Sequence, residues 1–532
     1  MTITTAGPRP AGESGPDGRG AGGGGAPARD LWFPLACYAT GQLVLLGWWL
    51  ALHPGLMSPD TVSYVRHVTT GPWIATHSVA YDALLRLSLR VAGDLSPVTL
   101  LQTTAMSAAL THLAGALRPY GPRRRWLVAA VGCAALLPPL GAFTVTMWKD
   151  VPFTICVLLA AGTAARIAAR PRAASRKGDG APNGGTVPES GMAPDGGTVP
   201  DGGAAPDGGT APDGRRPRGR AWDPRLAALG AELLGAGLFR NNGFVVTLIA
   251  AALLVPLLPV ARRWTAAVAA VAVAVPPLLT VTGYPALGIA PPPRVFAYQT
   301  VFGDLAVAYA ERPGLFDRGQ RELLTRIAPI ETWLRGATCH TVTRVYFDPD
   351  FDGREAERHV SEVMDLWRDL LVRAPGVILD ARLCRAALAW RIGSTAGDPG
   401  GELYRFSLRD PVLPPAWEGT PVAAVMRARP LSEGLRTAAL TALDAAGAHR
   451  LEWLLWRGAL WCHLCYAAAA LARRRTGNRT VAAVAAVICA QQLCVLLTNT
   501  AQDFRFMVTP IIAGVLLLPT LLREVRALLS PR

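Results

Sequence analysis

The stretch TVTMWKDVPF, residues 144–153, places two charged residues in a very short gap between two apolar runs. Lys149 and Asp150 separate apolar blocks at about 126–147 and 151–168. Each block is close to the roughly 20 residues that a helix needs to cross the hydrocarbon layer of a membrane. The stretch therefore predicts two consecutive membrane spans joined by a short polar turn.

The same pattern extends over the whole chain. Its 532 residues are 51% hydrophobic and 17% charged, too apolar for a soluble protein of this length. Candidate spans lie at about 31–53, 96–117, 126–147, 151–168, 226–240, 243–260, 264–282, 453–471, 480–498 and 506–522. The predicted fold is an all-α polytopic membrane protein with about ten transmembrane helices and a mainly helical extracytoplasmic domain.

The formal charge of +15 comes almost wholly from arginine, because Lys149 and Lys177 are the two lysines of the chain. The arginines gather in alternate loops and are not interleaved with aromatic residues on one surface, which argues against a nucleic-acid partner. Basic loops of a membrane protein face the cytoplasm, so we expect a cell-membrane protein with both termini cytoplasmic. In a chain this rich in arginine, a lysine at 149 suggests a specific role for an ammonium group.

Composition divides the chain into six parts. Prolines recur every six residues after the fourth span, in units such as PDGGTV, and such a tract cannot form an apolar core. Calcium-binding repeats are a weaker interpretation, because they recur every nine residues. The predicted parts are a disordered cytoplasmic N-terminus (1–30), spans one to four (31–170) with a first outer loop (54–95), a disordered cytoplasmic repeat loop (171–222), spans five to seven (223–282), an extracytoplasmic domain (283–452), and spans eight to ten with a cytoplasmic tail (453–532).

The parts outside the membrane are predicted to be helical. In the first outer loop, polar and apolar residues alternate at helical spacing, which indicates a helix lying on the membrane surface. Its polar face would hold Asp82, Arg86 and Arg90, and its apolar face Leu84, Leu87 and Val91. In the extracytoplasmic domain the patterns predict helices near 317–328, 354–373 and 376–392.

Polar residues adjoin the spans mainly at the outward side. They are Asp60 after the first span, Lys149 and Asp150 between the third and fourth, Arg240, Asn241 and Asn242 between the fifth and sixth, and Asp503 with Arg505 before the tenth. Since these turns share one side of the membrane, we expect acids, cations and amides to lie at one depth.

Each of these residues also has a simpler interpretation. Asp60 could be the cap of a short helix, and Lys149 with Asp150 could be a polar turn between helix ends. Arg505 could extend to the membrane interface. The RNNG stretch could be a hairpin turn in which Gly243 supplies a positive backbone angle. Their occurrence together on one face favours a functional site.

Other motifs carry weaker signals. Asp348, Asp350 and Asp352 imitate the start of a calcium loop, but His359 stands where a bidentate glutamate is required, which favours a turn and helix cap. Cys462 and Cys465 lie inside an apolar block and are interpreted as buried small side chains and not as a metal site. Cys339 and Cys384 lie outside the membrane and could form a disulfide.

The outward-facing residues suit transfer of a sugar from a lipid phosphate to an acceptor hydroxyl. A carboxylate such as Asp60 would take the proton of the attacking hydroxyl. Fixed positive charge from Lys149, Arg240 and Arg505 would stabilise the departing phosphate. Asp150 could orient the ammonium of Lys149 or bind a divalent metal ion together with Asp60.

The chain resembles the GT-C superfamily of integral-membrane glycosyltransferases, which use polyprenyl-phosphate sugars, and most closely a bacterial family of that type. The stretches that carry the resemblance are MSPDTVSY, ATHSVAYDALLRL, MWKDVPF, LFRNNGF, RVFAYQTVFGDLAVAY, VYFDPDFDG and QDFRFMVTP, in this order. The resemblance implies a catalytic acid at Asp60 and phosphate-binding residues at Lys149, Arg240 and Arg505. Relatives commonly have proline where Ser78 follows His77, and the Asp-Glu pair of some mannosyltransferases is absent at Asp60, which leaves metal dependence open.

The sequence thus predicts an inverting glycosyltransferase whose sugar is mannose and whose partners are a polyprenyl-phosphate sugar, membrane lipid and a hydroxyl-bearing acceptor. The acceptor could be an envelope glycan, a protein or a secreted natural product such as a glycopeptide antibiotic. The predicted site comprises Asp60 and Asp150 as catalytic residues, Lys149, Arg240 and Arg505 at the donor phosphate, and Tyr64, His77, Asn241, Gln299 and Asp503 at the substrates. A secondary transporter or lipid flippase is the alternative, although it should show inverted repeats and polar groups at the midplane. A scaffold protein without catalysis is a third reading.

Overall fold

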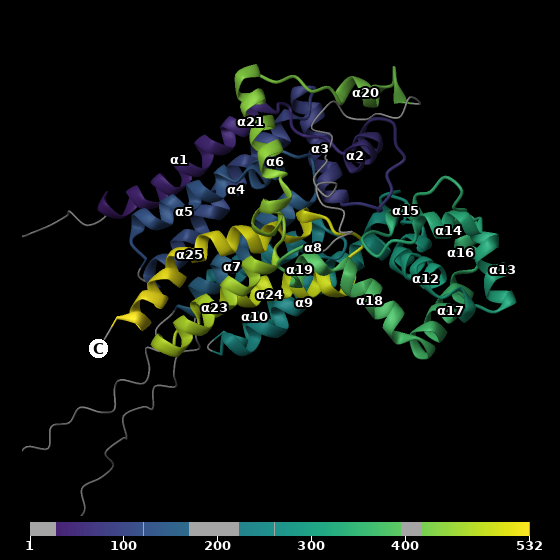
Figure 1. The fold of residues 1–532 in the computed structure, drawn as a ribbon. Helices are drawn as coiled ribbons and strands as arrows, with labels where there is room; N and C mark the ends of the chain where they lie inside the picture. Colours follow the sequence, from purple (N-terminus) through teal and green to yellow (C-terminus); the bar gives the residue numbers. More distant parts are fainter. Residues whose placement is uncertain (1–27, 121, 170–222, 260, 395–416, 531–532) are drawn as a thin grey trace, which may run out of the picture.

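The computed structural model describes residues 28–120, 122–169, 223–259, 261–394 and 417–530 (Figure 1). Within these ranges the chain forms helices and no sheet, which confirms the all-α prediction. The predicted disordered segments 1–30 and 171–222 lie outside the described residues, except for the first residues of α1.

A bundle of mostly long helices forms one part of the described chain. Figure 1 shows its helices running side by side. They are α1 (Ala28–Ala51), α4 (Ser96–Leu117), α5 (Arg124–Leu136), α6 (Pro138–Thr144), α7 (Asp150–Ala168), α8 (Pro224–Phe239), α9 (Gly243–Leu257), α10 (Arg262–Leu278), α23 (Ala459–Thr476), α24 (Thr480–Thr498) and α25 (Val508–Leu529). A π turn (Leu279–Gly283) and α11 (Tyr284–Ala286) extend α10.

Several of these helices can cross a membrane. Among the described residues, six segments are long and apolar enough: Leu31–Ala51, Asp150–Ala168, Arg262–Ala286, His449–Thr476, Thr480–Thr498 and Phe504–Leu529. The bent pair α5 and α6, whose axes differ by 72°, makes a seventh if it crosses as one span. The prediction of a multi-pass membrane protein is thereby confirmed. The other predicted spans correspond to α4, α8 and α9, which form as helices but are too short or too polar to be assigned as spans from length and composition.

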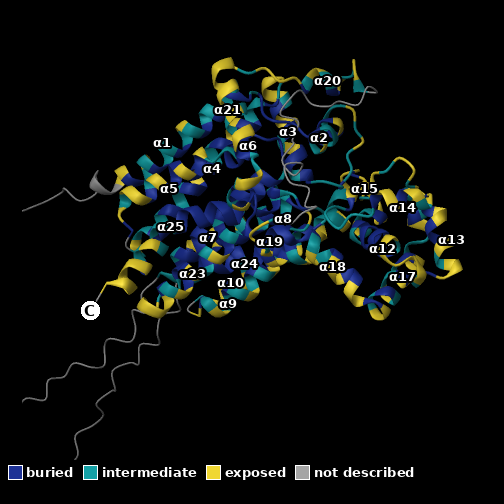
Figure 2. Ribbon diagram, in the orientation of Figure 1, coloured by how far each residue is buried: buried dark blue, intermediate teal, exposed yellow. Residues whose placement is uncertain are grey.

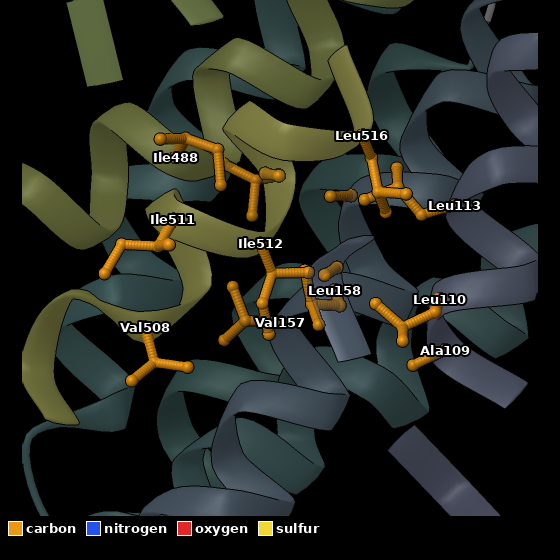
Figure 3. Packing of buried hydrophobic residues seen from close by; sticks show 14 of the residues in the cluster. Ala109, Leu110, Leu113, Val157, Leu158, Ile488, Val508, Ile511, Ile512 and Leu516 are labelled. Carbon is orange, nitrogen blue, oxygen red and sulfur yellow. The ribbon is translucent and has the colours of Figure 1, made fainter. Parts of the chain in front are cut away.

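The centre of the bundle is apolar. Leu113 of α4, Leu158 of α7, Ile488 of α24 and Leu516 of α25 are all fully buried where their helices meet (Figure 3). Figure 2 shows that buried residues dominate α7, α24 and the neighbouring helices, whereas exposed residues gather on the peripheral ones. Cys462 and Cys465 of α23 are completely buried in this core, as the sequence predicted.

Short helices cover one end of the bundle. Figure 1 shows α12–α18 at this end, away from the C-terminal end of α25. The helices are α2 (Pro59–Thr69), α3 (Val79–Ala92), α12 (Gln299–Glu311), α13 (Arg318–Ile327), α14 (Ile330–Gly336), α15 (Thr343–Tyr346), α16 (Gly353–Arg358), α17 (Val360–Arg373), α18 (Pro375–Arg385), α19 (Ala387–Trp390), α20 (Pro421–Val425), α21 (Glu433–Ala446) and α22 (Glu452–Leu455). The predicted helices near 317–328, 354–373 and 376–392 are therefore present, the last two each broken into two pieces.

Backbone contacts tie distant loops together at this end. Isolated bridges join Leu56 to Thr146, Ile74 to Ala290, and Thr341 to Ala501. The first bridge requires Gly55, whose φ is 144°, because a Cβ there would lie 2.6 Å from a methyl group of Thr99. The loop before α2 is thus held against the loop before α7.

The helix predicted on the membrane surface forms as α3, but its polar face differs from the prediction. Asp82 is buried, with 1% of its surface exposed, and its Oδ2 lies 2.8 Å from Nδ1 of His67. Leu87 and Val91 are exposed together with Arg86 and Arg90. The prediction was wrong for Asp82, because an inward partner on α2 outweighs the side-chain pattern of α3 alone.

The acidic motif at residues 348–352 forms a turn and a helix cap. Asp352 accepts hydrogen bonds from the backbone N–H groups of Arg354 and Glu355 at the start of α16. Asp348 and Asp350 both pair with the guanidinium of Arg335, at 3.3 and 3.2 Å. A cationic side chain therefore already lies where the calcium interpretation would need a metal ion.

Candidate functional site

One face of α2 supplies three side chains of the site. Ser58 caps the helix and forms a capping box with Thr61, so Asp60, in the first turn, does not act as the cap. Asp60, Tyr64 and His67 follow at helical spacings of four and three residues, which align them along one face. The simpler interpretation of Asp60 as the helix cap is therefore incorrect.

Arg505 lies at the centre of three carboxylates. Its Nη1 donates a hydrogen bond of 2.6 Å to Oδ2 of Asp60 and lies 3.8 Å from Oδ2 of Asp150. Its Nε lies 2.8 Å from Oδ2 of Asp503. The three acids come from α2, from the start of α7 and from the loop before α25. Arg505 therefore holds together elements that are far apart in the sequence.

Arg240 forms the second cationic contact with this group. The residue is buried, and its Nε lies 3.4 Å from Oδ1 of Asp150. The ring of Phe506 lies 4.5 Å from the Arg240 guanidinium and 5.3 Å from that of Arg505. An aromatic face attracts such cations, so Phe506 fixes both arginines beside Asp150.

Lys149 differs from the two arginines in its partners. Its ammonium donates hydrogen bonds to the hydroxyl of Tyr64 (3.3 Å) and to Nδ1 of His77 (2.9 Å). Among the described residues, no carboxylate lies within ion-pair distance of this ammonium. Lys149 is partly exposed. It is consequently a cation of the site whose contacts are all with neutral groups.

Burial and neighbouring charges shift the pKa values of the site residues that lie outside the membrane spans. Burial opposes the charge of Asp60, but Arg505 and Lys149 outweigh it and hold the pKa of Asp60 well below its usual range. Burial, reinforced by Lys149, lowers the pKa of His77 to about 3, so this imidazole is neutral and accepts from the ammonium. Burial raises the pKa of Asp503 to about 6.

Most of the predicted site residues come together, and two lie apart. Asn241 is exposed, and its side chain donates to the carbonyl of Thr76, so it holds the segment before His77. Gln299 is buried at the start of α12. In the part of the chain that the structure describes, no hydrogen bond or ion pair joins Gln299 to the charged group.

The hairpin interpretation of residues 240–243 needs correction as well. Gly243 has no positive φ. Its backbone instead passes so close to the Ala236 carbonyl that a Cβ would lie 2.2 Å from the carbonyl oxygen.

Several residues of the site were not predicted. Trp148 donates to the hydroxyl of Ser58 at 2.7 Å, and its ring lies 4.9 Å from the Arg505 guanidinium. Phe506 and His67 were also missed. Trp148 and Phe506 directly adjoin Lys149 and Arg505 in the sequence, and His67 continues the face of Asp60 and Tyr64. Their positions next to predicted site residues in the sequence, or on the same helix face, could have identified all three.

The carboxylates do not fit a divalent metal ion as they are arranged. A metal site would need Asp60 and Asp150 to turn free oxygens toward one point. Arg505 lies between them and pairs with Asp60 directly, so a guanidinium already neutralises these acids. The predicted metal-binding role of Asp60 with Asp150 therefore finds no support in this geometry.

A second group of potential ligands lies near the short helices α15 and α18. Cys339, His340 and Cys384 bring their ligand atoms within 4.8 Å of one another. The two cysteines are joined in a disulfide, with Cα atoms 5.7 Å apart, so neither offers a thiolate to a metal. Gln502 donates to the Cys384 carbonyl at 2.6 Å. The disulfide thus lies against the loop that leads to Asp503 and Arg505.

The charged group combines three chemical capabilities. Asp60 can accept a proton, the two arginines can form paired hydrogen bonds to an oxyanion, and Lys149 can add a compact positive charge. The side chains of Asp60 and Arg505 are 28% and 20% exposed, so both can be reached by a ligand. Comparison with protein-family models, curated proteins and solved structures finds no match, so this arrangement is the basis for assigning a function.

Proposed function

We propose that the protein is an integral-membrane glycosyltransferase that moves a sugar from a polyprenyl-phosphate donor to an acceptor hydroxyl at the outer face of the membrane. The observation that carries the proposal is the convergence of Asp60 with Lys149, Arg240 and Arg505. The proposal also includes ten membrane spans of the GT-C type, two cytoplasmic termini and an extracytoplasmic site. Mannose is the proposed sugar, on the resemblance alone.

In this reaction the acceptor oxygen attacks the anomeric carbon while Asp60 takes its proton. The bond between the anomeric carbon and the phosphate oxygen breaks, and the lipid phosphate leaves with the electron pair. Attack from the side opposite to the phosphate inverts the anomeric configuration. Lys149, Arg240 and Arg505 stabilise the negative charge that collects on the leaving phosphate.

The pairing of Asp60 with Arg505 implies an order of events. A carboxylate that accepts a short hydrogen bond from a guanidinium is a weak base. A donor phosphate that bonds to Arg505 competes with Asp60 for the same Nη1 group. Donor binding therefore increases the basicity of Asp60, and the base becomes effective when the sugar is in place.

Lys149 is the group best suited to meet the incoming phosphate first. Each arginine is already within 4 Å of at least one carboxylate, whereas Lys149 contacts Tyr64 and His77. Asp150 acts in this scheme as a positioning residue, because it lies against both arginines. Asp503 plays the same part at the Nε side of Arg505.

Transfer from a radiolabelled polyprenyl-phosphate mannose in membranes that contain the protein tests the proposal. Asp60→Asn should reduce the rate by about 10²–10⁴-fold, the usual contribution of a general base. Asp350→Asn, which alters an exposed acid of the outer domain, is the matched control and should retain the wild-type rate.

Two outcomes would contradict the proposal. Wild-type rates in Asp60→Asn would remove the catalytic assignment. Movement of lipid across the membrane without any sugar transfer by the wild type would favour the flippase alternative.

A further inference from the structure

A buried acid and imidazole lie behind the charged group and take no part in the reaction described above. Asp82 of α3 and His67 of α2 are 1% and 6% exposed, and Oδ2 of Asp82 lies 2.8 Å from Nδ1 of His67. Burying an acid is costly unless a partner compensates for it. The other oxygen of Asp82 has no hydrogen-bond partner among the described residues. The structure therefore retains a buried negative charge or proton-binding group at this point.

The pair connects to Lys149 through His77. The ring centroids of His67 and His77 are 6.4 Å apart, and the ring of His77 meets the Tyr64 ring edge-on at 4.9 Å. Nδ1 of His77 accepts the hydrogen bond from Lys149. The contacts run from Asp82 through His67 and His77 to the ammonium, along the same face of α2 that carries Asp60.

We propose that His67 and Asp82 are a positioning pair that fixes His77 against Lys149 and keeps the Lys149 side chain charged where the donor phosphate binds. This inference rests on the proposed function for its ligand. The His67 ring lies beside the His77 ring. The carboxylate of Asp82, paired with His67, is close enough to Lys149 for the two charges to attract each other.

Several other charges act on the ammonium of Lys149. Burial lowers the pKa of Lys149, and nearby acids counteract this shift. The charged and titratable groups around the ammonium are Asp60 and Tyr64 on α2, His77 before α3, Asp150 on α7, Arg240 before α9, and Arg505 before α25. The two arginines disfavour the ammonium, and Asp60 and Asp150 are paired with them. Asp82 lies outside these arginine pairs.

The chain offers an unusually selective test, because Lys149 and Lys177 are its two lysines. In a Lys177→Arg background, acetylation of Lys149 by acetic anhydride can be followed by mass spectrometry as pH varies. The pH at half-maximal rate then measures ionisation of Lys149 without any sugar-transfer assay. A failure of the proposed glycosyltransferase activity would leave this readout intact.

Asp82→Asn should move the half-maximal pH of Lys149 acetylation downward, whereas Asp82→Glu, which keeps the charge, should leave it near the wild-type value. Asp94→Asn is the matched control. Asp94 accepts hydrogen bonds from the backbone N–H and the hydroxyl of Ser96, and its substitution should leave the profile unchanged. In the transfer assay, Asp82→Asn should lower kcat about tenfold or more at alkaline pH. His67→Gln should lower kcat in the same way.

An unchanged acetylation profile in Asp82→Asn would overturn the electrostatic role of Asp82. Equal shifts in Asp82→Asn and Asp82→Glu would point to packing and would overturn it as well. Unchanged kcat in His67→Gln in an active enzyme would remove His67 from the positioning pair.

Discussion

Arg505 and Arg335 are both surrounded by aspartates, and the two groups differ in how they are assembled. Arg335 pairs with Asp348 and Asp350, which lie 13 and 15 positions away in the sequence, and its side chain is 57% exposed. Arg505 is 20% exposed and bonds to Asp60, which lies 445 positions away. The first group is a local surface turn, whereas the second requires several elements of the fold to converge.

The difference separates a structural ion pair from a candidate site. Exposed pairs are screened by water, and they contribute little to stability. Partly buried charges must be compensated by partners, and groups with shifted pKa values cluster at functional sites. The number of elements that meet at a charged residue therefore indicates a functional site better than the number of ion pairs that the residue forms.

The largest expected effect is that of Arg505→Gln. It leaves Asp60, Asp150 and Asp503 without their shared guanidinium, so we expect transfer to fall by about 10³-fold and stability by about 3 kcal/mol. Arg335→Gln is the matched substitution and should shift Tm by less than about 1 °C. Transfer assays and thermal unfolding in detergent measure both. Similar losses in the two variants would abolish the distinction between the groups.

Removing the disulfide should have the next largest effect on transfer, and a larger effect on stability than Arg505→Gln. Cys339 and Cys384 close a segment of 45 residues, which corresponds to about 4 kcal/mol in the chain-entropy description. The double variant Cys339→Ser with Cys384→Ser should lose that much stability, and transfer should fall with it because Gln502 adjoins the site. Cys462→Ser is unsuitable as a control, since that thiol is buried in the bundle core. Cys133→Ser, which alters an exposed cysteine, should be neutral.

The pH dependence of stability offers a sharper test of the Arg505 group. The pKa of Asp503 rises from 3.8 to about 6 on folding, so the folded state binds more protons than the unfolded state in this interval. Ionised Asp503 therefore costs stability as pH rises from 3.8 to about 6, at most about 3 kcal/mol. Asp60 has the opposite sign: its contribution is present above 3.8 and is lost as pH falls below it.

The measurement compares Asp503→Asn with wild type by thermal unfolding across that interval. The variant should gain stability relative to wild type as pH rises. A difference that does not depend on pH would show that Asp503 titrates normally.

The smallest effect is expected for Asp350→Asn in the acidic turn. Because Arg335 already lies in the acidic turn and His359 replaces the bidentate glutamate, calcium should find no site there. Adding calcium chloride should leave the Tm of wild type and variant unchanged. A calcium-dependent rise in Tm that Asp350→Asn removes would restore the calcium interpretation.

The sequence predicted which residues would meet better than it predicted how they pair. Asp60, Lys149, Arg240 and Arg505 could be grouped because each adjoins the end of an apolar run, and the ends of spans on one side of a membrane share a depth. Asp150 was expected beside Lys149 or a metal, yet it contacts the arginines. Proximity in the sequence does not determine which partner a side chain faces.

The predictions failed mainly where a polar residue is buried by a partner from another element. Asp82 was assigned to solvent because its helix alone places it with Arg86 and Arg90, and the contact with His67 could not be inferred from that spacing. The error has a general cause: side-chain periodicity describes a single helix, and burial depends on what packs against it. Gln299, which was grouped with the site from its motif, is buried at the start of α12, and its role at a substrate stays a prediction.

The distance in sequence between Asp60 and Arg505 has a consequence for biosynthesis. During translation Asp60 is made early and Arg505 only after 445 further residues, so the hydrogen bond between them cannot form until the loop before α25 has left the ribosome. A nascent chain that stops before this point contains Asp60 and Asp150 but lacks the guanidinium that joins them. The charged group can thus assemble only after synthesis has passed Arg505, and products truncated before it should be inactive even when they are inserted correctly.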